Sequence, residues 1–470
     1  MQFDTVVAGG QVVTAADTFR ADVGIIDGRI ACLAQGLAGS AAKVIDATDR
    51  LVLPGGIDAH CHLDQQSPAG INHADDFLSG TRSAVAGGTT TIIPFANQRH
   101  GQPLRLAVDA YREKAEKAVI DYAFHLILCD PNAGVIGQEL PSLIEEGYTS
   151  FKVFMAYDSL HVSDRQILEL MDLSRRERTL VMIHAENHDC CEWLTEKLLA
   201  EGRTEPRYHA VAHGDPVERE ATYRAIALAE VAGAQVLIVH VSSGNAMREI
   251  AAAQQRGIPV LAETCPQYLF LSEADMDRPG FEGAKFICSP PPRERGNQEL
   301  IWRGIQTGVF QVFSSDHAPY RFEGTGGKGR HGHDAAFNRI ANGVPGLATR
   351  LPLLFSAGVR QGRISLQRFV EITATNPAKI YGLYPRKGSI AVGADADLAI
   401  WDPGRKVMIR KEMLHDNMDY TPYEGMEVEG WPVITMSRGE VVCADGQVTA
   451  ERGRGRFLPC DRIQEMKAWL

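Results

Sequence analysis

The sequence predicts a (β/α)8 barrel of the TIM type together with a small β-sandwich domain formed from both chain termini. Between residues 55 and 380, short apolar runs alternate with helical stretches, a pattern typical of parallel strands buried on both faces. Both ends of the chain instead consist of short strand-like segments and turns. A chain of 470 residues is long enough for one large and one small domain.

Eight apolar runs are the predicted barrel strands. They cover residues 56–63, 89–95, 122–128, 151–155, 180–185, 236–241, 259–264 and 312–316. Helical segments at residues 104–118, 164–178, 217–232 and 244–256 separate many of them. A doubly wound open sheet is the alternative, but no G-x-G-x-x-G phosphate loop follows the first run. We therefore expect a barrel.

The terminal segments predict hairpins. Near the N-terminus, residues 5–13 suggest one hairpin and residues 23–30 another, which has an Asp-Gly turn. Near the C-terminus, residues 396–401, 433–436 and 440–448 are strand-like, and the last of these segments contains another Asp-Gly turn. The expected division is residues 1–54 and 381–458 for the β-domain, 55–380 for the barrel and 459–470 for a C-terminal tail. The stretch at residues 451–470 has a basic start and looks like a tail that can pack on a neighbouring subunit.

Composition excludes several classes of function. The net charge of -11 disfavours nucleic acid or an anionic membrane surface as a partner. No apolar run is long enough to span a bilayer, and the first residues do not start a signal peptide. Nine cysteines without a C-x-x-C pair indicate reduced thiols in the cytoplasm and no cysteine-ligated metal.

Two histidines, His60 and His62, lie at the end of the first apolar run. In an extended strand, residues two apart face the same side, so both imidazoles can bind one divalent ion. Further polar side chains occur within or at the end of other runs, and the C-terminal mouth of a barrel is where these meet. The candidate metal ligands are His60, His62, Lys152, His184, His240 and Asp316.

Four imidazoles and one carboxylate are suitable ligands for zinc or a similar divalent ion, with manganese and cobalt as alternatives. A Lys152 ammonium would repel metal, but a buried neutral amine can react with carbon dioxide to give a carbamate that bridges two ions. Two ions about 3.5–4 Å apart would share an activated bridging hydroxide.

Eight short motifs are spread over nearly the whole chain. They are GGIDAHCH at 55–62, SFKVFMAY at 150–157, HAEN at 184–187, HVSS at 240–243, CSPP at 288–291, SSDHAP at 314–319, NGVPG at 342–346 and NPAKIYGLYPRKG at 376–388. In these motifs and in their order the sequence resembles the cyclic amidohydrolases, within them the dihydropyrimidinase/hydantoinase branch.

The resemblance implies a role for each candidate. It assigns His60, His62, Lys152 and Asp316 to the more buried metal, and Lys152 as carbamate, His184 and His240 to the more exposed one. It implies that Asp316 shuttles the proton and that Tyr157 donates a hydrogen bond to the developing oxyanion. It further implies that the backbone groups of Ser289 and Asn342 hold the imide edge of a small cyclic substrate. A homotetramer is implied, with a homodimer as the alternative.

The expected reaction is hydrolysis of the ring amide of dihydropyrimidines, 5-monosubstituted hydantoins or both, giving N-carbamoyl amino acids. Dihydroorotase is disfavoured, because Asp64 stands where those relatives place an arginine for the substrate carboxylate. An allantoinase or another cyclic imide or ureide hydrolase remains the alternative, although allantoinases typically lack the Phe-Met-Ala-Tyr segment. A non-catalytic scaffold of the same fold is disfavoured by the complete ligand set. The polar loop at residues 65–67 and the segment 157–163 resemble gate loops that contact the ring substituent.

Overall fold

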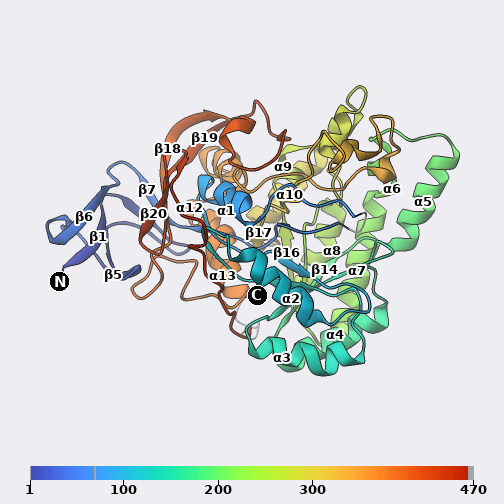
Figure 1. Cartoon of the computed structure of the whole chain (residues 1–470), viewed down its shortest axis with the longest axis horizontal. Helices are drawn as coiled ribbons and strands as arrows, with labels where there is room; N and C mark the ends of the chain where they lie inside the picture. Colours follow the sequence, from blue (N-terminus) through green and yellow to red (C-terminus); the bar gives the residue numbers. More distant parts are fainter. Residues whose placement is uncertain (1, 68–69, 464–470) are drawn as a thin grey trace.

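The computed structural model describes residues 2–67 and 70–463. Figure 1 shows two regions: a β-rich part, where N-terminal strands (blue) and the C-terminal strands β18, β19 and β20 (red) lie together, and a larger part in which strands and helices alternate. The fold is a TIM-type barrel with a separate β-domain, as predicted. Among the described residues, no helix is both long and apolar enough to cross a membrane.

All eight predicted barrel strands are present, and every pairing between them is parallel. The second and third runs are each interrupted, so they form two short strands apiece. A parallel bridge between Cys61 and His317 joins the last strand region to the first. The strands are β8 (Gly56–Asp58), β9 (Thr89–Ile92), β10 (Phe95–Asn97), β11 (Asp121–Tyr122), β12 (His125–Ile127), β13 (Ser150–Phe154), β14 (Leu180–His184), β15 (Val236–Ile238), β16 (Val260–Thr264) and β17 (Val312–Phe313).

Several strands end earlier than the apolar runs indicate. β8 ends at Asp58, β15 at Ile238 and β17 at Phe313, so four of the candidate ligands lie just beyond a strand. The expectation that His60 and His62 sit in a regular strand is therefore wrong. Cys61 between them still forms the parallel bridge to His317, which keeps this segment extended.

Helices cover the outside of the barrel. The helix α4 shows why: Ile167, Leu170, Met171 and Ser174 are buried, a spacing that places them on one face of a helix. The Ser163 side chain and the Gln166 side chain form a capping box at its start. The longer helices are α1 (Phe77–Ala86), α2 (Leu104–Ala115), α4 (Asp164–Glu177), α5 (His188–Ala200), α7 (Asp215–Ala232), α8 (Gly244–Gln255) and α10 (Arg295–Gln306).

Strands from both termini build the β-domain. One sheet has the order β5-β4-β1-β6 and the other β21-β20-β19-β18-β7-β2-β3. The strand β7 joins the two ends of the chain, because it pairs in parallel with β2 and antiparallel with β18. The strands are β1 (Phe3–Ala8), β2 (Gln11–Val13), β3 (Thr18–Arg20), β4 (Asp22–Ile26), β5 (Arg29–Ala34), β6 (Ala41–Asp46), β7 (Leu51–Pro54), β18 (Leu398–Met408), β19 (Glu427–Ser437), β20 (Glu440–Ala444) and β21 (Gln447–Val448).

One predicted hairpin is wrong and two Asp-Gly turns are confirmed. Residues 5–13 do not form a hairpin, because β1 and β2 belong to different sheets and the chain crosses between them at Gly9, whose φ is 77°. The Asp27-Gly28 turn connects β4 to β5, and the Asp445-Gly446 turn connects β20 to β21. All four turn residues have positive φ, as a two-residue hairpin of this type requires.

The described part of the C-terminal segment lies on its own barrel. The Gly455 amide donates to Ala118 O at 2.8 Å, the Cys460 amide to Gly147 O at 3.0 Å and the Ile463 amide to Arg178 O at 2.8 Å. These residues therefore contact the barrel of their own chain, and the packing of the tail on a neighbouring subunit stays a prediction. Residues 464–470 lie outside the described residues, and the domain boundaries at residues 54, 380 and 458 stay predictions.

A buried ion cluster links the barrel to the β-domain. The Lys387 Nζ lies 2.8 Å from Asp121 of the barrel and 2.7 Å from Asp397, which immediately precedes β18. Asp395 contributes a third carboxylate at 3.0 Å. Asp121 and Asp395 also pair with Arg438 and Arg386, but Asp397 has no second cation in the described residues. Because these groups are buried, removing the Lys387 ammonium would leave the Asp397 carboxylate without an ion partner in a low-dielectric environment.

We expect Lys387→Met to lower the free energy of unfolding by about 3–5 kcal/mol, the usual cost of removing one partner of a buried ion pair. Denaturant-induced unfolding followed by fluorescence measures it. Lys406→Met is the matched control, since Lys406 is exposed on β18 and should change stability by less than about 0.5 kcal/mol. Equal stability of the two variants would contradict a linking role for Lys387.

Candidate active site

A cavity of about 420 Å³ opens at the C-terminal ends of the barrel strands. The structure brings all nine of the sequence-predicted site residues to its wall. These are His60, His62, Lys152, Tyr157, His184, His240, Ser289, Asp316 and Asn342. The convergence follows from the barrel, because parallel strands deliver their carboxyl ends to the same rim.

Backbone conformation turns several of these residues into the cavity. Lys152 lies within β13 and His184 ends β14, whereas His240 and Asp316 follow their strands. The φ angles of Tyr157, His240 and Asp316 are 67°, 38° and 46°. Residues with a side chain adopt this left-handed region at a cost of about 1–3 kcal/mol, and such residues concentrate at functional sites.

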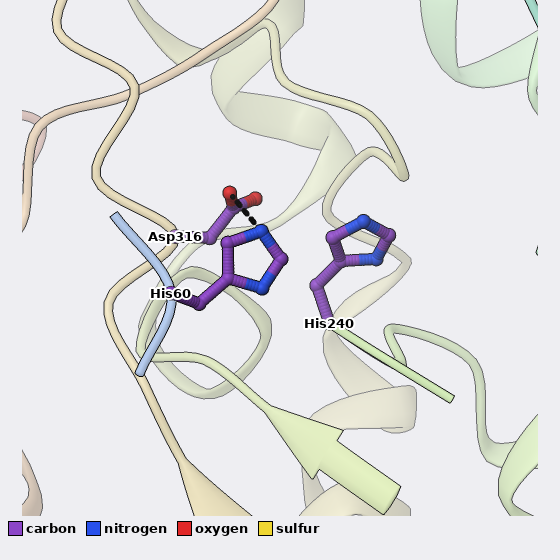
Figure 2. Close-up of side chains that lie close together, drawn as sticks. All are labelled: His60, His240 and Asp316. Atoms are coloured by element: carbon purple, nitrogen blue, oxygen red, sulfur yellow. Dashed lines mark ion pairs between the residues drawn. The ribbon is translucent and has the colours of Figure 1, made fainter. Parts of the chain in front are cut away.

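The possible ligand atoms form two adjacent groups. The His60 Nε2 and His62 Nε2 lie 3.2 and 3.5 Å from the same Asp316 oxygen. The His184 Nδ1 and His240 Nε2 face each other at 2.9 Å. Figure 2 shows His60, His240 and Asp316 side by side, and their ligand atoms all lie within 4.8 Å of one another.

Most of the imidazoles are oriented through their other ring nitrogen. The His60 Nδ1 lies 2.7 Å from Glu263, the His62 Nδ1 2.8 Å from Gln65 and the His184 Nε2 2.7 Å from Glu186. Metal-binding histidines usually donate this second N–H to a carboxylate or amide oxygen, which fixes the tautomer and the ring orientation. The remaining nitrogens of these rings therefore point into the cavity.

The sequence alone assigned no role to Glu263 or Glu186, and it placed Gln65 only in a loop that resembles a gate for the ring substituent. A carboxylate inside the apolar run 259–264 is the signal that could have identified Glu263, because an unpaired carboxylate is rarely buried. Its Oε1 also accepts the His240 amide at 3.1 Å. Burial raises the pKa of Glu263 to about 7. One side chain thus holds two of the candidate ligands.

Burial also sets the charge of the ligands. It lowers the pKa of His60, His184 and His240, and the positive charge of Lys152 lowers them further, so their imidazoles are neutral near pH 7. Burial alone would raise the pKa of Asp316, but His60, His62 and Lys152 hold it below its usual value. Neutral imidazoles beside a carboxylate form a good donor set for a divalent ion.

Lys152 differs from an ordinary lysine. It is 1 % exposed, and burial lowers the pKa of its amine to about 8. Its Nζ lies 5.3 and 5.1 Å from the ring centroids of Phe95 and Phe154. A substantial fraction of this amine is neutral near pH 8 and carries a lone pair, which an ammonium lacks.

Tyr157, Ser289 and Asn342 line the same cavity, and the centroid of the Tyr157 ring lies 5.2 Å from that of the His184 ring. Burial raises the pKa of the Tyr157 phenol well above 10, so the hydroxyl stays protonated and can donate. Hydrogen bonds to Ser289 and Asn342 oppose that shift. The Ser289 Oγ also lies 3.1 Å from His209 Nε2.

Other histidines near the site contact protein groups. The His317 Nε2 lies 3.1 Å from Asp75, and its Nδ1 accepts the Gly346 amide. His188 stacks on His161 and lies 3.3 Å from Asp158. His331 reaches the cavity wall, while His333 stacks on Phe281.

Comparisons with known proteins identify the family of the chain. The sequence pattern of the amidohydrolase family matches residues 51–442. A D-hydantoinase of Geobacillus stearothermophilus is 46% identical over 455 residues, which cover 96% of this chain and 95% of that protein. The crystal structure of dihydropyrimidinase from Brevibacillus agri superposes with a TM-score of 0.95 at 43% identity, covering 98% of this chain and 99% of the other.

An L-hydantoinase (dihydropyrimidinase) from Arthrobacter aurescens is also similar, with a TM-score of 0.89 and 29% identity over 97% of this chain and 100% of the other. The chain therefore belongs to the amidohydrolase family, in its dihydropyrimidinase/hydantoinase branch. Membership of this family of metal-dependent hydrolases supports the use of divalent metal, and the donor set in the cavity fits it.

We expect Glu263→Gln to weaken metal binding about 10–100-fold, because a neutral amide is a poorer acceptor for the N–H of His60. Competition with a metal chelator measures the affinity. Glu273→Gln, which changes an exposed carboxylate away from the cavity, is the control. Equal affinities in both variants would show that Glu263 does not orient a ligand.

Proposed function

We propose that the protein opens the ring of 5-monosubstituted hydantoins, dihydropyrimidines or both by hydrolysing a cyclic amide bond, and so releases N-carbamoyl amino acids. The observation that carries this proposal is the meeting of six potential metal ligands in one cavity at the barrel mouth. The D-hydantoinase and dihydropyrimidinase relatives support the substrate class. The complete ligand set argues against a non-catalytic scaffold.

Two divalent ions occupy the site in this proposal, most suitably zinc, with manganese and cobalt as alternatives. His60, His62, Lys152 and Asp316 would hold one ion, and Lys152, His184 and His240 would hold the other. Lys152 would contribute to both sets as a carbamate formed from carbon dioxide, and its buried amine, with a pKa of about 8, supports that reaction. When bound, the ions activate a water molecule and polarise the carbonyl oxygen of the substrate.

Asp316 transfers a proton from the attacking water to the departing ring nitrogen in this proposal. Its carboxylate faces His60 and His62, and its lowered pKa keeps it ionised at neutral pH and ready to accept a proton. It takes the proton of the attacking water and then delivers it to the departing ring nitrogen. A carboxyl group that is held in place can act as base and then as acid within one cycle.

Tyr157 and its neighbours position the ring. The protonated Tyr157 hydroxyl donates to the oxygen on which negative charge develops, an interaction that is stronger in the transition state than in the bound substrate. The backbone groups of Ser289 and Asn342 hold the imide edge. Gln65, Ser67 and Leu160, which also line the cavity, contact the ring substituent.

We also infer a homotetramer, with a homodimer as the alternative, from the resemblance to this branch. A cytoplasmic location is supported by the cysteines, all nine of which are unpaired in the described residues.

A side-by-side assay tests the proposed reaction. With zinc and bicarbonate supplied, we expect turnover of dihydrouracil, a 5-substituted hydantoin or both, followed as loss of the ring amide absorbance. Preference for dihydrouracil would identify a dihydropyrimidinase, and preference for the hydantoin a hydantoinase. Metal-loaded protein that opens neither ring would overturn the substrate class and favour another cyclic imide or ureide.

Carbamate formation predicts a pH dependence. Because the neutral amine is the reactive form and its pKa is about 8, the neutral fraction rises about tenfold between pH 7 and pH 9. We expect metal-free protein to regain activity about tenfold faster at pH 9, at one fixed concentration of dissolved carbon dioxide and metal. Stopped assays during reactivation measure the rate.

Lys152→Ala should bind fewer ions and remain inactive at both pH values, whereas the exposed-site control Lys406→Ala should behave like the unmodified protein. A Lys152→Ala variant that kept two ions and full activity would refute the carbamate.

A further inference from the structure

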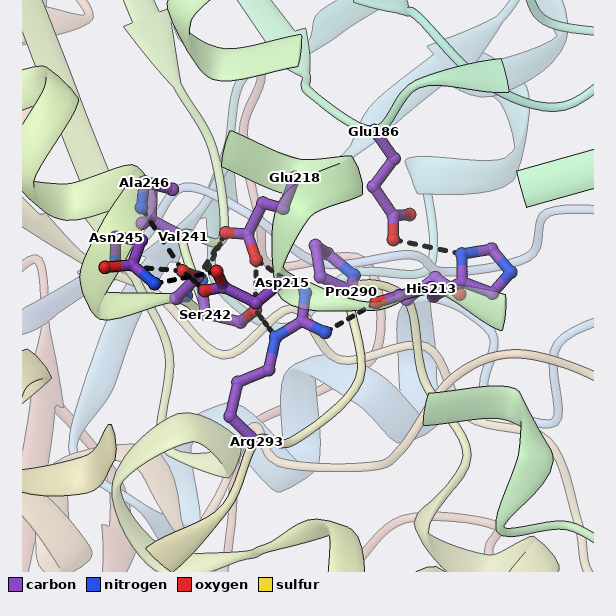
Figure 3. A network of polar contacts seen from close by, with 12 residues as sticks. Glu186, His213, Asp215, Glu218, Val241, Ser242, Asn245, Ala246, Pro290 and Arg293 are labelled. Atoms are coloured by element: carbon purple, nitrogen blue, oxygen red, sulfur yellow. Dashed lines mark hydrogen bonds and ion pairs between the residues drawn. The ribbon is translucent and has the colours of Figure 1, made fainter. Parts of the chain in front are cut away.

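A second cluster of potential metal ligands lies behind the catalytic cavity. Glu186 follows β14, Cys191 is in the first turn of α5, and His213 follows α6 (Tyr208–Ala212). The His213 Nδ1 lies 3.0 Å from the Glu186 Oε1 and 3.5 Å from the Cys191 Sγ. The three ligand atoms lie within 4.8 Å of one another. Figure 3 shows Glu186 and His213 facing each other.

The geometry of this cluster is close to that of a metal site. With zinc bonds of about 2.0–2.1 Å to N or O and 2.3 Å to S, tetrahedral angles separate N from O by about 3.4 Å and N from S by about 3.6 Å. The observed 3.0 and 3.5 Å need only small movements. The single proton on the His213 Nδ1 cannot form a full hydrogen bond to both Glu186 and Cys191. A cation in place of this proton would contact all three ligand atoms.

The charges around the cluster also balance. A thiolate and a carboxylate neutralise a divalent ion. Arg293 donates to the His213 carbonyl oxygen, but its guanidinium is paired with Glu218 at 2.7 Å. Cys191 is 5 % and His213 8 % exposed, so the cluster is buried without being sealed from solvent.

We propose that Glu186, Cys191 and His213 form a separate site for a thiophilic divalent ion of the zinc class, and that an ion bound there slows catalysis. The coupling is through Glu186, whose other oxygen, Oε2, lies 2.7 Å from the Nε2 of the candidate ligand His184. A cation bound to Oε1 draws electron density away from the Glu186 carboxylate and shifts the position of this carboxylate. Both effects weaken the hydrogen bond that orients His184. Binding does not depend on the proposed function, but the inhibition rests on it.

Metal content and spectroscopy test the binding. Enzyme that carries its two catalytic equivalents is dialysed against rising concentrations of zinc, and in parallel of cobalt. We expect a third equivalent of metal and, with cobalt, a thiolate-to-cobalt charge-transfer band, since the proposed catalytic ligands include no sulfur. Cys191→Ser should lose the third equivalent and the band. Cys190→Ser, which changes the adjacent exposed cysteine, should keep both.

The absence of a third equivalent and of the band in the unmodified enzyme would overturn the proposal, and so would a band that persists in Cys191→Ser. The measurement on the unmodified enzyme decides the question even if Cys191→Ser does not fold, and Cys191→Ala is a second variant.

Inhibition is measured separately on the same preparations. We expect excess zinc to reduce turnover in the unmodified enzyme and in Cys190→Ser, with the inhibitory concentration at least tenfold higher in Cys191→Ser. A third bound ion with unchanged turnover would refute the coupling through Glu186. Two-equivalent enzyme that opens neither ring before zinc is added would instead be a failure of the proposed function, so the two failures are distinguishable.

Discussion

The removal of Lys152 from water is the constraint on which the rest of the active site depends. An exposed lysine is a permanent cation near neutral pH, and a cation at this position would repel any metal bound by the neighbouring imidazoles. Inside the barrel, between Phe95 and Phe154, burial lowers the pKa of the amine to about 8. A closed barrel of parallel strands can provide such a dry position only a few ångströms from an open cavity.

Two further features position the remaining site residues: unfavourable backbone conformations that the barrel stabilises, and hydrogen bonds to buried side chains. His240 and Asp316 adopt left-handed backbone conformations, which the packed barrel around them must stabilise. Glu263, Gln65 and Glu186 orient three of the imidazoles. Glu186 also connects the cavity to His213 in the surrounding helical layer, so a change in that layer can reach a candidate ligand without touching the substrate.

Much of the fold and of the candidate site was predictable because the relevant signals are local. Apolar runs of strand length located all eight barrel strands, and the two Asp-Gly pairs located hairpin turns, since only a few residue types accept positive φ at both turn positions. The polar residues at the ends of these runs also predicted which side chains meet. The carboxyl ends of all parallel strands in a barrel lie on the same side of it. The metal and catalytic roles of those residues remain proposals.

The amino-acid sequence by itself thus determined the barrel, the two-ended β-domain and the set of side chains around the cavity. Only the tertiary structure decided that β1 and β2 enter different sheets, that β8 ends before His60, and which groups support the ligands. His60 and Glu263 are separated by 203 residues, and Lys387 and Asp121 by 266. Such pairings depend on the closure of the barrel and on strand register, which periodicity and turn chemistry do not encode.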